Sequence, residues 1–178
     1  MNRMEQDAAR VLRIQELLHF VNLDIVRHPG ESESDQMRHD KHIATYEKVL
    51  WIVEALYIDR PASRVFTLDI GLTAPLYDVA CRCRDPCVRR RALHVLKTRA
   101  RQEGIYESTL AVKIAETVVS MEEEGLGGVQ TAADIPNSAR VFQVSRSFDL
   151  GARTATLGFY RPDPLGVEPR CDYYTVDF

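Results

Sequence analysis

The sequence predicts a mainly α fold, a helical bundle followed by a C-terminal β-hairpin. Two observations support this prediction. Up to about residue 124, apolar residues recur at the three- and four-residue spacing of helices that bury one face. Beyond residue 139 the pattern changes to the alternation of half-buried strands. Because the chain has 178 residues, 45% of them hydrophobic, we expect one domain spanning 1–178.

Two long helices are predicted first, over residues 5–28 and 35–59. Their core-facing residues are Val11, Ile14, Leu17, Leu18, Val21 and Ile25 in the first helix, and Ile43, Tyr46, Val49, Leu50, Val53, Leu56 and Tyr57 in the second. The proline and glycine at 29–30 end the first helix, and Ser34 or Asp35 is expected to cap the second.

Three shorter helices are predicted over residues 73–83, 85–98 and 105–124. Asp85 is expected to cap the middle one, because its carboxylate accepts from the free N–H groups of the first turn and a proline follows it. The last helix ends in a run of three glutamates, 122–124, which oppose the helix dipole at a cost of about 0.3–1 kcal/mol. We expect this end either to fray or to meet a basic partner.

The C-terminal quarter has strand character. Residues 139–160 alternate apolar and polar side chains around the turn-forming sequence Asp149-Leu150-Gly151, which predicts a β-hairpin. The segment 161–178 follows with several prolines, and we expect it to form an irregular tail.

Composition excludes some function classes. The net charge of −3 argues against broad binding of nucleic acid, although basic residues are concentrated between Arg82 and Arg101. No apolar run approaches the roughly 20 residues that span a bilayer, so no membrane partner is expected. The N-terminus lacks the pattern of a secretory signal, which favours a reducing compartment and free cysteines.

Cysteines and histidines raise the question of a metal site. A metal site would combine Cys81, Cys83 and Cys87 with Cys171 or His94. Structural zinc sites usually show paired C-x-x-C units, and this spacing does not. The pair His39-x-x-His42 lacks a third ligand. We therefore expect core cysteines and solvated histidines, with no metal, no cofactor and no catalytic residue assigned.

The arginine run allows two interpretations. Its guanidinium groups could bind phosphate, nucleic acid or an acidic partner through bidentate contacts. Alternatively, and this is the interpretation we favour, they pair within the fold with acids such as Asp69, Asp78, Asp85 and Glu103. The candidate ligand- or partner-binding residues are Trp51, Tyr77, Arg82, Arg84, Arg89, Arg90 and Arg101.

Several ordered motifs carry a family resemblance. They are Leu68-Asp69-x-Gly71, Pro75-Leu76-Tyr77, Cys83-Arg84-Asp85-Pro86, Arg89-Arg90-Arg91-Ala92-Leu93 and Arg101-Gln102-Glu103-Gly104. Together with Ile135-Pro136 before the hairpin, they resemble the distal part of the regulatory domain of fungal binuclear zinc cluster transcription factors. The resemblance covers roughly residues 40–160 and implies a helical regulatory domain that acts in the nucleus, with the cytoplasm as the alternative.

The chain also departs from that family. Those factors bind DNA through six cysteines that hold two zinc ions, whereas this chain has four cysteines in another arrangement. We therefore expect a regulatory-domain fragment or stand-alone relative, with no sequence-specific DNA binding by this chain alone.

Three function hypotheses follow. The first is a transcription-regulator-like interaction module linked to fungal secondary metabolism, which binds a protein partner or a second copy. The second is a sensor whose pocket among Trp51, Tyr46, Tyr57 and Tyr77 binds a small apolar metabolite. The third is a secondary-metabolism enzyme with Asp78, Arg82, His94 or Tyr106 in a cavity. We rank the enzyme last, because the sequence shows no positioned pair of nucleophile and base.

Overall fold

A computed structural model describes residues 2–26, 35–57, 65–67, 71–98, 101–103, 106–163 and 168–177. For 65–67, 101–103 and 106–107 it describes the backbone. No helix in these ranges is both long enough and apolar enough to cross a membrane.

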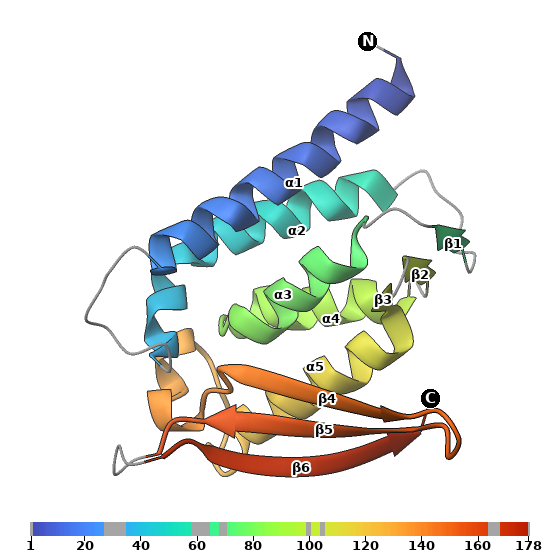
Figure 1. The fold of residues 1–178 in the computed structure, drawn as a ribbon. Helices are drawn as coiled ribbons and strands as arrows, with labels where there is room; N and C mark the ends of the chain where they lie inside the picture. Colours follow the sequence, from blue (N-terminus) through green and yellow to red (C-terminus); the bar gives the residue numbers. More distant parts are fainter. Residues whose placement is uncertain are drawn as a thin grey trace.

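The helices form the larger part of the molecule (Figure 1). Helices α1 (Arg3–Val26) and α2 (Ile43–Tyr57) pack side by side as an outer layer. Helices α3 (Thr73–Arg82), α4 (Pro86–Thr98) and α5 (Ser108–Glu123) pack against one another beneath them. The apolar stripes predicted from the sequence face this shared core, and the prediction of a mainly α fold is confirmed.

The predicted helix 35–59 is divided. Residues Gln36–His42 form a 3₁₀ segment, η1, and the α-helix begins at Ile43. Asp35 caps η1 by accepting from the Met37 N–H. The Gln36 N–H donates to Asn137 Oδ1 at 2.9 Å and its carbonyl accepts from Arg140 Nη1 at 3.1 Å. These contacts with residues about a hundred positions away use the backbone groups of Gln36, so η1 does not continue as part of α2.

The predicted hairpin is confirmed, and a third strand extends it. Strands β4 (Gln143–Asp149), β5 (Thr154–Arg161) and β6 (Arg170–Asp177) form an antiparallel sheet in the order β4-β5-β6. The prediction of an irregular tail over 161–178 was therefore wrong for residues 170–177. The prolines only delay the strand, and the β-prone sequence after them pairs with β5 along its whole length.

A second, smaller sheet was not predicted. Strands β1 (Val65–Thr67) and β2 (Arg101–Glu103) are parallel, and β3 (Tyr106–Glu107) pairs with β2 in the antiparallel sense. Strands of two or three residues are too short to give an alternation that a sequence pattern can reveal. Short 3₁₀ segments, η2 (Ala132–Asp134) and η3 (Asn137–Ala139), connect α5 to the larger sheet.

One face of the larger sheet packs toward the helices. Its central strand contributes Ala155, Leu157 and Phe159, all fully buried in the shared core. The cross-strand pairs on this face are Val144 with Phe159, Arg146 with Leu157, and Phe148 with Ala155. Because side chains alternate along a strand, this register places an arginine on an otherwise apolar part of the inner face.

The start of α4 provides a direct test of the fold. Asp85 Oδ1 accepts from the Val88 N–H at 3.0 Å, as the sequence predicted. We expect Asp85→Ala to lower the free energy of unfolding by about 1 kcal/mol, because the cap is lost, whereas Asp85→Asn keeps an accepting oxygen and stays within about 0.5 kcal/mol of the wild type. Urea unfolding of the three proteins measures this, and equal stability of the alanine variant would contradict the capping role.

Candidate functional site

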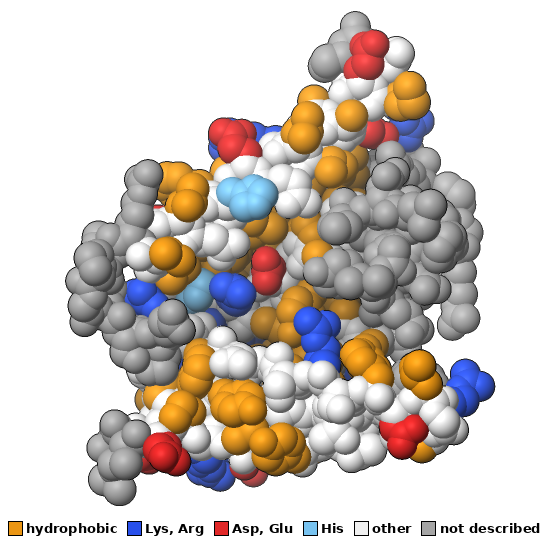
Figure 2. Space-filling view, in the orientation of Figure 1, with side chains coloured by type: hydrophobic (Ala, Val, Ile, Leu, Met, Phe, Trp, Pro, Cys, Tyr) orange, Lys and Arg blue, Asp and Glu red, His pale blue; other side chains and the backbone are white. Residues whose placement is uncertain are grey.

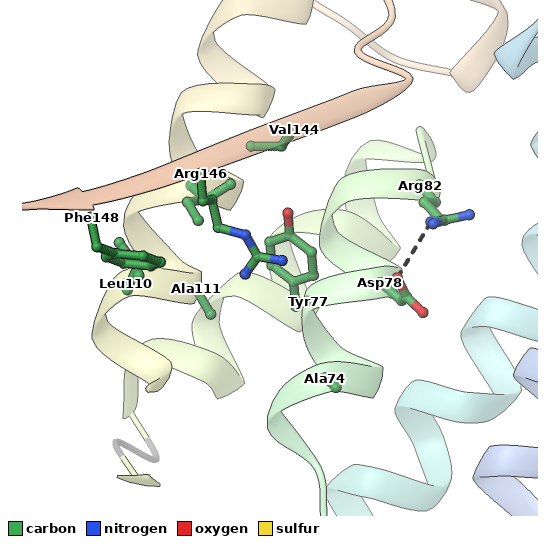
Figure 3. Close-up of a pocket in the computed structure, with 10 residues that line it drawn as sticks. Ala74, Tyr77, Asp78, Arg82, Leu110, Ala111, Val144, Arg146 and Phe148 are labelled. Carbon is green, nitrogen blue, oxygen red and sulfur yellow. Dashed lines mark ion pairs between the residues drawn. The ribbon is translucent and has the colours of Figure 1, made fainter. Parts of the chain in front are cut away.

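A cleft of about 720 Å³ lies between the helices and the inner face of the larger sheet (Figure 3). Helices α3 and α5 form one side and strand β4 forms the other. The lining residues are Ala74, Tyr77, Asp78, Arg82, Leu110, Ala111, Ile114, Val144, Arg146 and Phe148. Figure 2 shows the hollowed surface, with acidic and basic side chains among hydrophobic ones. A cleft of this size with mixed lining is typical of small-molecule sites.

Helix α3 supplies the polar groups of one wall. Asp78 and Arg82 are four residues apart and form an ion pair, with Arg82 Nε at 3.3 Å from Asp78 Oδ1. Burial raises the pKa of Asp78, and the charge of Arg82 opposes that shift. Burial also raises the pKa of Tyr77 above its usual value, so its phenol is neutral and can both donate and accept a hydrogen bond.

Strand β4 supplies a single cation to the opposite wall. The guanidinium of Arg146 points across the cleft and lies beside the ring of Tyr77 (Figure 3). Its charge acts on the Tyr77 phenol, which it makes more acidic. Within the described part of the chain, Arg146 has no hydrogen bond and no ion pair. It therefore offers its donors to whatever enters the cleft.

The remaining walls are apolar. Leu110, Ala111 and Ile114 follow one face of α5, and Val144 and Phe148 flank Arg146 on β4. The described lining residues combine a neutral phenol, an internal ion pair and one unpaired cation with these apolar surfaces. This arrangement suits the binding of a small molecule through hydrophobic contact and one charged group.

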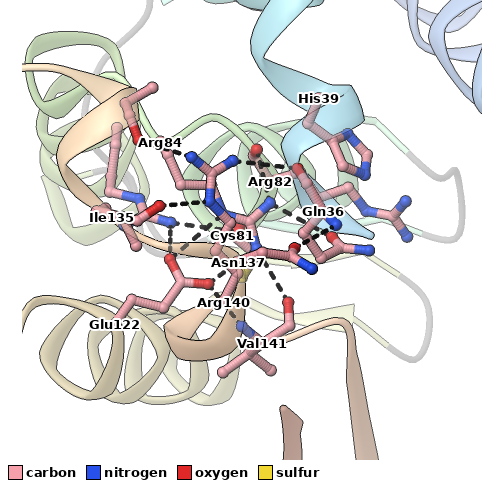
Figure 4. Close-up of polar contacts among 12 residues, drawn as sticks. Gln36, His39, Cys81, Arg82, Arg84, Glu122, Ile135, Asn137, Arg140 and Val141 are labelled. Atoms are coloured by element: carbon pink, nitrogen blue, oxygen red, sulfur yellow. Dashed lines mark hydrogen bonds and ion pairs between the residues drawn. The ribbon is translucent and has the colours of Figure 1, made fainter. Parts of the chain in front are cut away.

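A buried network of ion pairs joins the helices to the segment that precedes the larger sheet (Figure 4). Glu122, at the end of α5, is fully buried, as are Arg84 and Arg89. Arg84 Nη2 lies 2.8 Å from Glu122 Oε1, and Arg89 Nη2 lies 2.5 Å from Glu122 Oε2. The Val141 N–H also donates to Glu122 Oε1 at 2.8 Å. One carboxylate thus joins the α3–α4 junction, α5 and the segment that leads into the larger sheet.

Arg140 forms a second buried cluster. Its guanidinium makes a bidentate ion pair with Asp40, at 2.6 and 2.8 Å. It also donates to the carbonyls of Ala132, Ile135 and Gln36. These contacts fasten η1 to the connector before β4, and so fix the strand that carries Arg146.

The predicted site residues are dispersed. Tyr77 and Arg82 line the cleft, Arg84 and Arg89 belong to the buried network, and Arg90 Nη2 pairs with Glu123 Oε2 at 2.7 Å on the surface. Trp51 is 72% exposed on α2. The backbone of Arg101 lies in β2, and its side chain falls outside the described residues.

The arginine run pairs within the fold, as the favoured interpretation predicts, but mostly with acids other than the four that were named. Of the four predicted partners, Asp78 pairs with Arg82 and Asp85 serves as a cap, while the side chains of Asp69 and Glu103 lie outside the described residues. The acids that neutralise the run are Glu122, Glu123 and Glu54. They come from α5 and α2, more than thirty residues away along the chain.

The predicted aromatic pocket is not formed. Tyr46 and Tyr57 are buried in the core, Trp51 is on the surface, and Tyr77 alone reaches the cleft. Two residues of the cleft, Arg146 and Phe148, were not predicted from the sequence. The available signal was an arginine at every-second-residue spacing between Val144 and Phe148, which places all three side chains on one face of the strand.

The prediction of core cysteines and solvated histidines was wrong for Cys87, which is exposed, and for His39 and His42, which are buried. Cys81 and Cys83 are buried, Cys87 is exposed and Cys171 is partly exposed. Burial raises the pKa of both Cys81 and Cys83 to about 12, so they remain neutral thiols. Among the described residues, no group of three or more histidine, cysteine or acidic side chains is placed to hold a metal ion.

Sequence comparison finds one informative relative. Over 100 residues the chain is 37% identical to the aspercryptin biosynthesis cluster-specific transcription regulator of Emericella nidulans. The matched region covers 54% of this chain and 16% of that protein, so the chain spans a small part of the relative's length. No protein-family model matches the chain, and no solved structure matches it.

Proposed function

We propose that the chain is a regulatory module of a transcription regulator that controls genes of fungal secondary metabolism and acts in the nucleus. The observation that carries this proposal is the 37% identity with a cluster-specific transcription regulator. The fold is compatible with it, because buried ion pairs from five segments hold the helices and the sheet in one fixed arrangement around a cleft.

The module acts by binding other molecules rather than by reading DNA itself. The net charge of −3 is unfavourable for contact with a phosphate backbone. In addition, Arg84, Arg89 and Arg140 already form ion pairs with carboxylates of the chain. Exposed apolar side chains on the outer helices, including Leu12, Phe20 and Trp51, suit contact with a protein partner.

A sensor is the second candidate function, and the cleft favours it. The cleft has the volume of a small-molecule site, with apolar walls and few polar groups. It lies against the same helices that the buried network joins, so a bound ligand would contact the elements that the module uses to hold its shape.

Deleting the coding sequence of residues 1–178 in the organism that encodes it tests the regulatory function. We expect a defined set of transcripts to rise or fall, and complementation with the wild-type sequence to restore them. Complementation with the destabilised Glu122→Ala variant should be weaker than with the wild type, and complementation with Glu124→Ala should be complete. Unchanged transcripts accompanied by the loss of a single metabolite would contradict regulation and favour the enzyme hypothesis.

A further inference from the structure

Arg146 lies on the same face of the larger sheet as the buried residues of β5, and it has no hydrogen bond or ion pair with any residue that the structure describes. The other cross-strand residues around it, Val144, Phe148, Leu157 and Phe159, are apolar. Arg146 is solvent-exposed, so its guanidinium is accessible to a ligand that enters the cleft. The buried arginines of the described residues, Arg84, Arg89 and Arg140, in contrast each pair with a carboxylate of the chain.

The charge balance of the cleft points the same way. Among the described residues that line the cleft, the charged groups are two guanidinium groups, of Arg82 and Arg146, and one carboxylate, of Asp78. Arg82 lies 3.3 Å from Asp78, so this pair neutralises itself. One positive charge therefore remains on Arg146, directly beside the phenol of Tyr77 (Figure 3).

We propose that the cleft binds a small molecule in which an anionic group, a carboxylate or a sulfonate, is attached to an apolar aromatic body. Arg146 holds the anion in a charge-assisted hydrogen bond, and the Tyr77 hydroxyl donates a second one. Leu110 and Phe148 contact the apolar body. The inference rests on the proposed regulatory function, because it names the class of ligand that the module would sense.

A matched pair of fluorescent probes tests this proposal on the purified chain. Anilinonaphthalene sulfonate carries an anion on an aromatic body, and N-phenylnaphthylamine has nearly the same body without the charge. We expect the wild-type protein to bind the sulfonate saturably at one site, and at least about tenfold more tightly than the neutral probe.

Variants at Arg146 locate the site. Arg146→Gln should weaken binding of the sulfonate by roughly tenfold or more and change binding of the neutral probe by less than about twofold, whereas Arg146→Lys should retain part of the affinity. Arg153→Gln removes an exposed arginine from the β4–β5 turn and should leave both affinities unchanged. Near-ultraviolet circular dichroism of each variant checks that its side chains keep their native packing. A native spectrum excludes the binding of the probe to a partly unfolded core.

Three results would overturn the proposal. The first is that the wild-type protein binds the two probes with equal affinity. The second is that Arg146→Gln weakens the binding of both probes to the same extent. The third is that Arg146→Gln leaves the affinity for the sulfonate unchanged. None of these results depends on transcription. Failure of the ligand proposal is therefore distinguishable from failure of the regulatory function, which the deletion experiment tests separately.

Discussion

Replacing Glu122 by alanine is expected to lower the free energy of unfolding by about 3–5 kcal/mol, because it leaves two fully buried guanidinium groups without a counter-charge. Arg84 and Arg89 both pair with this carboxylate, and neither has any exposed surface. The Val141 N–H loses its acceptor in the same substitution. Since a domain of this size is stable by about 5–15 kcal/mol, such a loss removes a large share of the total.

The neighbouring glutamate supplies the control. Glu124 belongs to the same acidic run but is exposed, so Glu124→Ala should change the stability by less than about 0.5 kcal/mol. Denaturant unfolding followed by circular dichroism measures both variants against the wild type. If the two substitutions lower the free energy of unfolding by the same amount, the buried ion pairs of Glu122 do not stabilise the fold as proposed.

The environment of Glu122 could not be read from its local sequence. Three glutamates at the end of a helix predict an exposed or frayed terminus, since the helix dipole disfavours them. Burial alone would raise the pKa of Glu122, but Arg84 and Arg89 outweigh it and lower the pKa below 4.5. The basic partner anticipated for this terminus is thus part of the same chain. Its residues are 33 and 38 positions away, and no periodic pattern connects such distant charges.

Elements governed by local rules were predicted well. The cap at Asp85 depends on its own side chain and the next three residues, and the structure shows it as expected. The cleft depends instead on which face of β4 meets α3 and α5. The position of Arg146 became meaningful only once the register with Leu157 was known. The exposure of Trp51 illustrates the same limit, because an aromatic residue in a helical stripe can fall just outside the buried face.

His39 should make the protein sensitive to mild acid. Its Nδ1 lies 2.7 Å from the Tyr46 hydroxyl in the core, and burial, with the charges of Arg84 and Arg82 adding to it, lowers the pKa of His39 from 6.5 to about 2. Below pH 6.5 His39 becomes protonated in the unfolded chain but stays neutral in the folded chain. The stabilising contribution is therefore complete above pH 6.5 and is lost as the pH falls toward 2, by up to about 1.4 kcal/mol per pH unit.

The window between pH 6.5 and 4.5 separates this effect from that of Glu122. Glu122 has a lowered pKa, so its stabilisation is present above 4.5 and declines only in stronger acid. Denaturant unfolding at intervals of half a pH unit should show a loss of about 2–3 kcal/mol across the window in the wild type. His39→Gln removes the titrating group and should flatten this slope, whereas His19→Gln, at an exposed position, should keep it. An unchanged slope in His39→Gln would show that another group controls the acid response.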